Sequence, residues 1–235
     1  MAMIRLDKFL ADMSFGTRTQ VKKMIKEKRV SIDGIVVRNA ELKVDMNTVV
    51  CVDEQEVHYQ QYEYYLLYKP MGYLSATEDS SQPTVMELIN SVRHDLFPVG
   101  RLDKDTTGLL IICNDGQLAH RLMDPDNHVD KRYYFTCEPS LPINAKEILA
   151  RPIEFADFSS RGGKLEKIDD NSGYLTISEG KYHQVKRMIG FLGCEVTSLK
   201  RVSLSFLNLD GLEIGDYRKL TDQEVRRLKD IVNMD

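Results

Sequence analysis

The spacing of hydrophobic residues over the first 58 positions predicts two short helices followed by strands. Residues 4–13 place three apolar side chains on one helical face. A second helix is expected after Thr17, because Thr17 and Gln20 match a capping box, in which each side chain bonds the backbone N–H of the other residue. The apolar period then alternates around an Asp33-Gly34 turn, and apolar residues recur at 49–52. These patterns predict a compact helix–helix–hairpin module over residues 1–58.

The remainder of the chain predicts an α+β domain over residues 65–235, built on a mostly antiparallel sheet with flanking helices. Residues 59–64 are polar and rich in tyrosine, and we interpret them as the linker. The continuous apolar run at 108–113 predicts a strand buried on both faces. Further strands are expected at 65–68, 133–137 and 175–177, and helices at 84–92, 117–123, 185–192 and from 221 onward. The helices at 84 and 221 each start with a Thr-x-x-Glu capping box.

Composition narrows the class of protein. Hydrophobic residues make up 42% of the 235 residues, and this is enough to bury a core, so a wholly disordered chain is excluded. No apolar run reaches the length of a membrane span, and the charged N-terminus does not match a signal peptide. The four cysteines lack C-x-x-C spacing, which argues against a zinc site and a disulfide framework. We therefore expect a cytoplasmic protein without a structural metal.

The net charge of −4 hides two basic clusters. Residues 1–30 contain eight basic and three acidic side chains, and residues 181–201 contain five basic side chains and one acidic. Attraction to a phosphate backbone depends on such local basic faces and not on the total charge. Taken alone, a lysine-rich helix is more often a plain solvated face. The basic clusters nevertheless leave nucleic acid open as a partner.

A polar turn at 100–108 holds the first group of side chains that could do chemistry. It places Asp103 and Asp105 beside Arg101, just before the apolar strand at 108–113. Taken alone, the turn is more typical of an ordinary loop whose Asp and Thr side chains bond their own backbone. Two carboxylates could also indicate glycoside hydrolysis. No histidine follows or precedes the turn closely, so a hydrolase triad is not indicated.

Two further segments carry reactive side-chain types. Tyr133 lies on a predicted strand, where a tyrosine more often serves in packing. Lys186 and Arg187 fall in the first turns of the helix at 185–192, although cations near a helix N-terminus are mildly unfavourable. Their placement suggests an anionic partner.

The N-terminal module resembles the ribosomal protein S4-type RNA-binding domain. The resemblance covers the order Arg-Leu-Asp-Lys-Phe-Leu, Thr-Arg, Lys-x-x-Ile-Lys and Val-Ser-Ile-Asp-Gly-x-Val-Val. In that family the second helix and the hairpin grip the RNA backbone. The resemblance implies backbone contacts from Arg5, Arg18, Lys22, Lys23 and Arg29. Such phosphate contacts position a protein without specifying sequence.

Four motifs along the chain together resemble the RsuA-type pseudouridine synthases. They are Lys-Pro-x-Gly-Tyr at 69–73, Gly-Arg-Leu-Asp-x-Asp-Thr-Thr-Gly-Leu at 100–109, Lys-x-Tyr at 131–133 and Glu-Gly-Lys-Tyr-His-Gln-Val-Lys-Arg-Met at 179–188. The resemblance implies that Asp103 is the essential carboxylate and that Tyr133 stacks on the target base. It also implies that Lys186 pairs with the aspartate and that Arg101 contacts RNA or fills the gap left by the displaced base.

The reaction implied by this resemblance is the isomerisation of uridine to pseudouridine in ribosomal RNA. The short C-terminus is similar to that of the members acting on small-subunit RNA. The reaction includes no redox or phosphoryl-transfer step, so we expect no cofactor and no metal. The implied partners are ribosomal RNA or a partly assembled small subunit, with no membrane. We expect a monomer, because one RNA-binding module and one active site suffice.

Three alternatives stay open at this point. The protein could act on large-subunit ribosomal RNA. It could be a non-catalytic RNA-binding assembly factor with a decayed site, although Asp103, Tyr133 and Lys186 are all present. It could also be a glycosidase-like hydrolase using Asp103 and Asp105.

Overall fold

The computed structural model describes residues 3–45, 47–91 and 93–234. The chain forms two compact units. The first comprises Met1–Glu63 and Asn90–Leu96, and the second comprises Tyr64–Ile89 and Phe97–Asp235.

The first unit packs two helices against a small antiparallel sheet. Its elements are β1 (Ile4–Arg5), α1 (Leu6–Asp12), α2 (Arg18–Lys26), β2 (Val30–Ile32), β3 (Ile35–Val36), β4 (Lys43–Val44), β5 (Val50–Val52) and β6 (Gln55–Val57). The sheet order is β3-β2-β5-β6, so the predicted hairpin is confirmed, and β5 and β6 form a second antiparallel pair. Helix α2 begins with the predicted Thr17–Gln20 capping box. The helix predicted over 4–13 starts later, at Leu6, because Ile4 and Arg5 pair with β4 instead.

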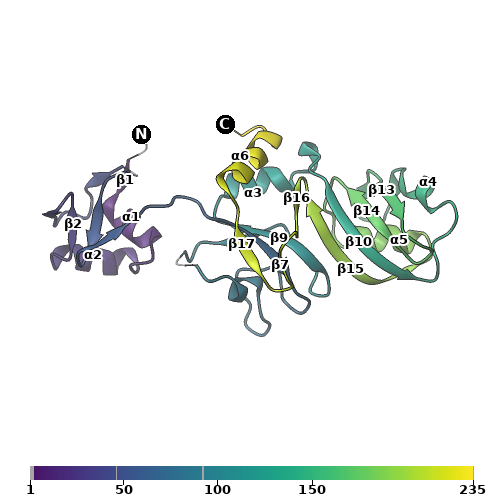
Figure 1. The fold of residues 1–235 in the computed structure, drawn as a ribbon, viewed down its shortest axis with the longest axis horizontal. Coiled ribbons are helices and arrows are strands. Elements are labelled where there is room, and N and C mark those ends of the chain that lie inside the picture. The colour runs from purple at the N-terminus through teal and green to yellow at the C-terminus, as the bar shows by residue number, and fades with distance from the viewer. Residues whose placement is uncertain (1–2, 46, 92, 235) are drawn as a thin grey trace. The chain divides into compact units, whose positions relative to one another are not determined.

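The apolar faces of the two helices pack together in the core of this unit. Val21 and Ile25 of α2 are fully buried with Leu6, Phe9 and Leu10 of α1. The opposite face of α2 exposes its lysines to solvent. Figure 1 shows α1, α2 and the strands of this unit close together.

The segment predicted as a linker is partly packed against the first unit. Tyr59 stacks on Phe9 with ring centroids 4.9 Å apart, and its hydroxyl donates to Asp12. Arg93, from the excursion at 90–96, donates to the carbonyl of Gln60 over 3.2 Å. The next element, β7, begins at Tyr64.

In the part of the chain that the structure describes, the second unit is built on a nine-stranded sheet of order β13-β14-β10-β15-β9-β7-β17, with β8 and β16 attached at its side. Its strands are β7 (Tyr64–Lys69), β8 (Phe97–Val99), β9 (Thr107–Cys113), β10 (Lys131–Glu138), β13 (Lys164–Lys167), β14 (Ser172–Ile177), β15 (Glu195–Leu204), β16 (Leu207–Asn208) and β17 (Tyr217–Lys219). Strands β15 and β9 run parallel, and the other strand pairs described in this sheet are antiparallel. The predicted α+β class is confirmed.

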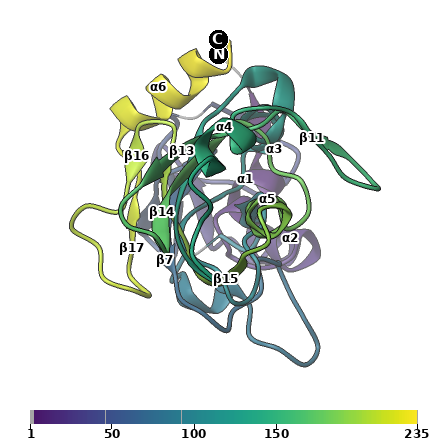
Figure 2. The same ribbon diagram turned by 90° about the vertical axis from the view of Figure 1, so that its right-hand side faces the viewer.

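Helices and a separate hairpin flank this sheet. They are α3 (Gly116–Met123), α4 (Ala145–Leu149), α5 (Gln184–Phe191), α6 (Asp222–Ile231) and the hairpin of β11 (Ile153–Glu154) with β12 (Ser159–Ser160). Helix α5 packs on β15, and Figure 2 shows it beside one face of the sheet, with the β11 hairpin projecting outward. Gly108–Cys113 of β9 are buried, so the apolar run is the interior strand that the sequence predicts. The helices expected at 117–123, at 185–192 and after Thr221 are confirmed to within a few residues.

The helix predicted over 84–92 is wrong in extent. The Thr84–Glu87 capping box is present, but it opens a single 3₁₀ turn over Val85–Leu88. Ile89 has extended backbone angles, and the chain then joins the first unit at Asn90. Val92, which the sequence places on the apolar face of this helix, lies outside the described residues. Local periodicity could not reveal that the chain leaves the domain at this point.

Gly108 brings the polar turn at 100–107 directly against β15. Its φ is +114°, and a Cβ at this position would lie 2.2 Å from the carbonyl oxygen of Arg201. Only glycine therefore permits this approach of the two parallel strands.

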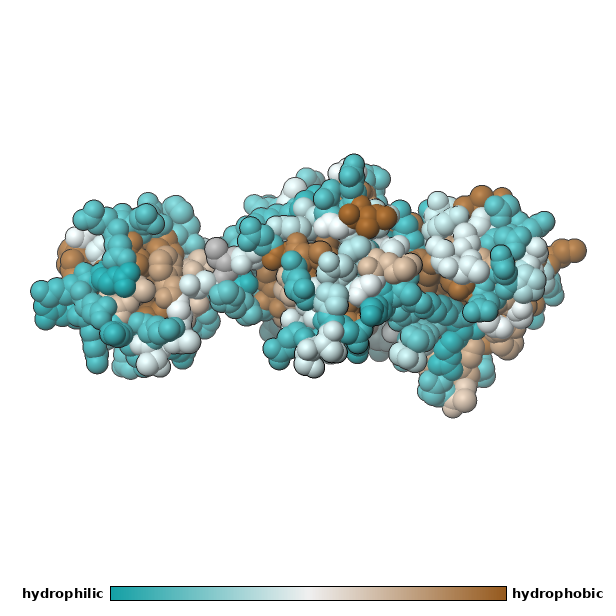
Figure 3. Space-filling view, turned by 90° about the horizontal axis from the view of Figure 1, so that it is seen from below, coloured by the Kyte–Doolittle hydropathy of each residue, from teal (hydrophilic) through white to brown (hydrophobic). Residues whose placement is uncertain are grey.

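The face of the molecule drawn in Figure 3 is mostly hydrophilic. Figure 3 shows hydrophobic residues in small separate groups on the face that it presents. Among the described residues, no helix is both long enough and apolar enough to cross a bilayer.

Candidate active site

A fully buried lysine holds the polar turn in shape. Lys69 lies at the end of β7, opposite Gly108 of β9, and its side chain is shielded from solvent. Its Nζ donates to the backbone carbonyls of Asp103 over 3.1 Å and of Thr106 over 2.9 Å, and approaches those of Pro70 and Lys104. An ammonium has three donors and no acceptor, so it is suited to gather several carbonyls of one loop.

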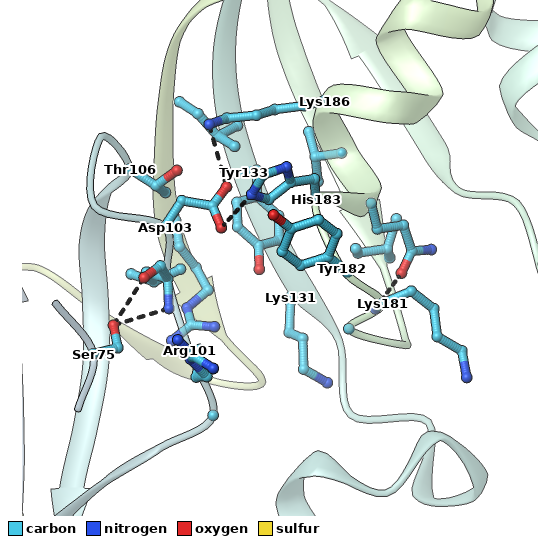
Figure 4. Close-up of a pocket in the computed structure, with 18 of the residues that line it drawn as sticks. Ser75, Arg101, Asp103, Thr106, Lys131, Tyr133, Lys181, Tyr182, His183 and Lys186 are labelled. Atoms are coloured by element: carbon cyan, nitrogen blue, oxygen red, sulfur yellow. Dashed lines mark hydrogen bonds and ion pairs between the residues drawn. The ribbon is translucent and has the colours of Figure 1, made fainter. Parts of the chain in front are cut away.

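A buried serine fixes the residue before Asp103. The Ser75 hydroxyl donates to the carbonyl of Leu102 over 2.9 Å, and it accepts the Leu102 N–H over 3.0 Å. Together, Lys69 and Ser75 hold the backbone on both sides of Asp103. The Asp103 side chain points away from Ser75 (Figure 4).

The Asp103 carboxylate faces two cationic or potentially cationic groups from α5. Its Oδ2 lies 3.2 Å from Lys186 Nζ, and its Oδ1 lies 3.3 Å from His183 Nε2 (Figure 4). The carboxylate is 28% exposed, so it is partly shielded yet still open to a ligand. These two contacts hold the side chain in a defined orientation.

Lys186 bridges two carboxylates. Besides Asp103, it donates to both oxygens of Asp105, over 2.7 and 2.9 Å. Partial burial acts to lower the pKa of Lys186, but hydrogen bonds to Asp105 and Asp103 outweigh it, and the pKa rises. The same hydrogen bond lowers the pKa of Asp105. Asp105 is therefore poorly suited to be the protonated general acid that the glycosidase alternative requires of one carboxylate.

His183 reaches Asp103 because the chain turns sharply before α5. His183 is the N-cap of α5 and adopts a left-handed backbone with φ of +50°. Its ring stacks on Tyr182 at a centroid distance of 3.8 Å. The sequence places His183 in the same motif as Lys186, but its left-handed conformation could not be foreseen, so its contact with Asp103 was missed.

A cavity of about 510 Å³ opens beside Asp103. Tyr133, on β10 and directly across from Arg201 of β15, contributes to its wall and is 8% exposed. Lys131 and Arg201 also line it and are buried, whereas Arg101 and Lys181 are exposed. The volume falls in the range of small-molecule sites, which is roughly 300–1,000 Å³.

The structure thus brings Asp103, Tyr133, Lys186 and Arg101 to one cavity, although the chain separates them widely. Reasoning from sequence did not select four other residues of this region, namely Lys69, Lys131, His183 and Arg201. Lys69 and Lys131 stand in the quoted motifs, and Arg201 lies in the second basic cluster. Their positions in the motifs and in the basic cluster could have indicated a role in the site, but residue spacing does not show that a side chain is buried.

Arg187 has an internal partner. It pairs with Asp157 of the β11–β12 hairpin over 3.0 Å, and its guanidinium lies over the rings of Phe155 and Phe158. The anionic partner that its sequence position suggests is therefore within this chain.

The basic residues of the first unit divide into two groups. Arg5 is bonded to Asp7 and Glu41, and Arg29 is bonded to Asp53. Arg18, Lys22 and Lys23 are exposed on α2, where the two lysines lie 3.8 Å from acidic partners. The second group is therefore more available to an incoming phosphate than the first.

Comparison with known proteins decides the family. Residues 63–190 match the RNA pseudouridylate synthase family, and residues 4–50 match the S4 domain. The chain belongs to the RNA pseudouridine synthase family. An uncharacterized RNA pseudouridine synthase of Bacillus subtilis is 42% identical, covering 97% of this chain and 99% of that protein. The RNA-binding module and the synthase domain expected from the sequence motifs are confirmed.

Two named relatives of this synthase are equally similar to it. The ribosomal small subunit pseudouridine synthase A of Escherichia coli is 37% identical, covering 94% of this chain and 98% of that protein. The ribosomal large subunit pseudouridine synthase B of Bacillus subtilis is also 37% identical, covering 97% and 96%. A crystal structure of a pseudouridylate synthase aligns with a TM-score of 0.67 at 34% identity, covering 96% of this chain and 99% of that one.

Because Lys69 is buried, we expect the protein to become more stable with rising pH than a variant that lacks this lysine. Burial lowers the pKa of Lys69 to about 8, although Asp103 and Asp105 act in the opposite direction. The unfolded chain holds this proton more tightly, so below about pH 8 folding carries a cost of about 3 kcal/mol. That cost is relieved as the pH rises from about 8 to about 10.

Lys69→Met lacks this titration. The difference in melting temperature between wild type and Lys69→Met should therefore shift by several degrees in favour of wild type over that interval, measured by circular dichroism. The exposed Lys146→Met serves as the control and should show no such shift. A difference independent of pH for Lys69→Met would contradict the assignment.

Proposed function

We propose that this synthase converts a uridine of small-subunit ribosomal RNA to pseudouridine, with Asp103 as the reacting carboxylate. One observation carries the proposal: the Asp103 carboxylate lies between Lys186 and His183 at a cavity that Tyr133 also lines. A carboxylate held in this way can act as nucleophile or base.

The proposed chemistry is a net isomerisation. The N1–C1′ bond of uridine breaks, the ring reattaches through C5, and the C5 proton leaves while N1 gains a proton. Asp103 bonds to the nucleotide or removes a proton from it during the separation. No redox cofactor enters this balance.

The target base must leave its stack to reach Asp103. Unstacking costs about a few kcal/mol, and an aromatic surface recovers part of that cost. Tyr133 is placed for this role, since its ring belongs to the cavity wall and its strand is fixed on both sides by β14 and β15. Unpaired or splayed bases of folded RNA are the natural substrates of such a site.

Exposed cations at the cavity mouth and on the first unit are proposed to hold the RNA backbone. Arg101 is exposed beside Asp103, where it can contact a neighbouring phosphate or fill the place of the displaced base. In the first unit, Arg18, Lys22 and Lys23 are the best available contacts. Arg5 and Arg29 contribute by exchanging their internal carboxylates for phosphates. We assign RNA binding to residues 1–58 and catalysis to 65–235.

The small subunit is the preferred substrate because several relatives carry that name, including those of Escherichia coli and Pasteurella multocida. A large-subunit relative of equal identity makes large-subunit RNA the second candidate. We propose that the protein acts as a monomer in the cytoplasm on ribosomal RNA or a partly assembled small subunit.

Release of tritium from C5 tests the substrate. Small- and large-subunit RNAs are prepared from cells that lack this protein, with uridine tritiated at C5. Because formation of the C5–C1′ bond expels the C5 hydrogen, wild type should release label from small-subunit RNA or its assembly intermediates. The same treatment of large-subunit RNA is the control. Release from the large-subunit RNA alone would replace the substrate, and release from neither would favour a non-catalytic assembly factor.

Reversing two charges on α2 tests the RNA-binding surface. The double variant Lys22→Glu/Lys23→Glu should bind ribosomal RNA more weakly, and the slope of log K against log salt should fall by about 1–2, because about two phosphate contacts are lost. Filter binding over a salt series measures both quantities.

The control double variant Lys146→Glu/Arg226→Glu makes the same change in net charge on exposed positions of the second unit. It should leave the slope close to that of wild type. If both double variants change the slope equally, α2 acts through net charge alone and is not a contact surface.

A further inference from the structure

Two buried cations lie together in the cavity beside Asp103. Lys131 of β10 and Arg201 of β15 are each 2% exposed, and both line the cavity. Tyr133 stands two residues after Lys131 on the same strand and directly opposite Arg201. Since side chains alternate along a strand, all three belong to the same face of the sheet.

The hydrogen bonds of these cations are incomplete. Lys131 Nζ donates to the carbonyl of Val129 over 2.8 Å, and Arg201 Nε donates to that of Leu109 over 2.7 Å. Arg201 Nη2 is buried without a hydrogen-bond partner in the part of the chain that is described. Within that part, neither side chain forms an ion pair with a carboxylate.

This arrangement of two cations is electrostatically costly. Burying a charge without a counter-ion is unfavourable, and two like charges near each other add to the cost. Burial, with a contribution from Arg201, lowers the pKa of Lys131 to about 8, while Asp130 and Glu179 act weakly in the opposite direction. Glu179 itself is occupied by the Arg161 N–H and the Gln184 side chain. An anion in the cavity would remove this cost.

The RNA phosphates and the flipped base differ in how deeply they can enter the cavity. RNA phosphates remain on the backbone outside, where the exposed Arg101 and Lys181 can meet them. Asp103 is already engaged by Lys186 and His183. The group that enters deepest is the flipped base, whose only polar edges are its ring N–H and carbonyl groups.

We propose that Lys131 and Arg201 bind the carbonyl oxygens of the target uracil and stabilise the negative charge that the ring gains when the N1–C1′ bond breaks. This inference rests on the proposed isomerisation. The electron pair of that bond passes to the ring, where it is shared by N1, O2 and O4. Asp103 completes C1′ by bonding to it or by removing the C2′ proton. When C5 attacks C1′, Asp103 leaves that carbon or returns the proton to C2′. The C5 proton is then lost and N1 is protonated, so no further reactant is needed.

Donors placed where charge develops contribute strongly in a site that excludes water. Lys131→Met should therefore lower the single-turnover rate of tritium release by about 10²-fold, with the dissociation constant for RNA changed by less than about threefold. Lys131→Arg, which keeps the charge, should recover much of the rate. Lys200→Met is the matched control, since Lys200 adjoins Arg201 on β15 but does not line the cavity.

A binding measurement separates charge stabilisation from a structural role. Free 5-nitrouracil is an anion near neutral pH, whereas free uracil is neutral. Wild type should bind 5-nitrouracil more tightly than uracil in competition with RNA, and Lys131→Met should lower that preference by about tenfold, the loss of one charged contact. A general disturbance of the cavity would weaken both bases equally and leave the preference unchanged.

Several results would overturn the inference. Wild type could show no preference for the anionic base, a measurement that needs no variant to fold. Lys131→Met could also keep the wild-type preference for 5-nitrouracil. Finally, inorganic phosphate could compete with RNA as well as 5-nitrouracil does, and Lys131→Met could lower the affinity for phosphate. Lys131 and Arg201 would then form a phosphate site. If wild type released no tritium from any ribosomal RNA while preferring the anionic base, the proposed function would fail and the anion site would stand.

Discussion

The hydrogen bonds from the buried Lys69 ammonium to the turn at 100–107 are the interaction on which the site depends. A turn of this length has no ladder of its own, and its carbonyls would otherwise face the interior unpaired. By gathering the carbonyls of Asp103 and Thr106, Lys69 fixes the direction in which the Asp103 side chain leaves the backbone. Burying the Lys69 ammonium is unfavourable for folding, but it holds the Asp103 carboxylate in one position.

The rest of the site is assembled from strands and a helix that meet the turn. Strand β10 supplies Tyr133 and Lys131, β15 supplies Arg201, and α5 supplies the residues that face Asp103. The parallel pairing of β9 with β15 is possible because Gly108 has no side chain. As a result, exposed cations lie at the cavity mouth and buried cations lie inside. The proposed function uses this arrangement to bind a long polyanion outside and a single base within.

Much of this could be predicted from the sequence, for physical reasons that differ from case to case. Capping boxes and apolar periods are local signals, so the predicted starts of α2, β9 and α6 lie close to those observed. The same capping signal at Thr84 opens only a single 3₁₀ turn, because the chain enters the first unit at Asn90. His183 was missed since its contact depends on one left-handed residue, and the pairing of Arg29 with Asp53 depends on a fold that brings distant residues together. The motifs indicated the reaction, but burial of Lys131 and Arg201 is visible only in three dimensions.

A comparison of the two neighbouring carboxylates tests the central claim most directly. Asp103 and Asp105 both bind Lys186, but Asp103 lines the cavity and Asp105 is 65% exposed. Tritium release from C5-labelled small-subunit ribosomal RNA would be measured for Asp103→Asn and Asp105→Asn under single-turnover conditions, with RNA binding checked in both. The account predicts that Asp103→Asn binds RNA and releases no label, while Asp105→Asn stays within about tenfold of wild type. Release by Asp103→Asn at a rate near that of wild type would contradict it.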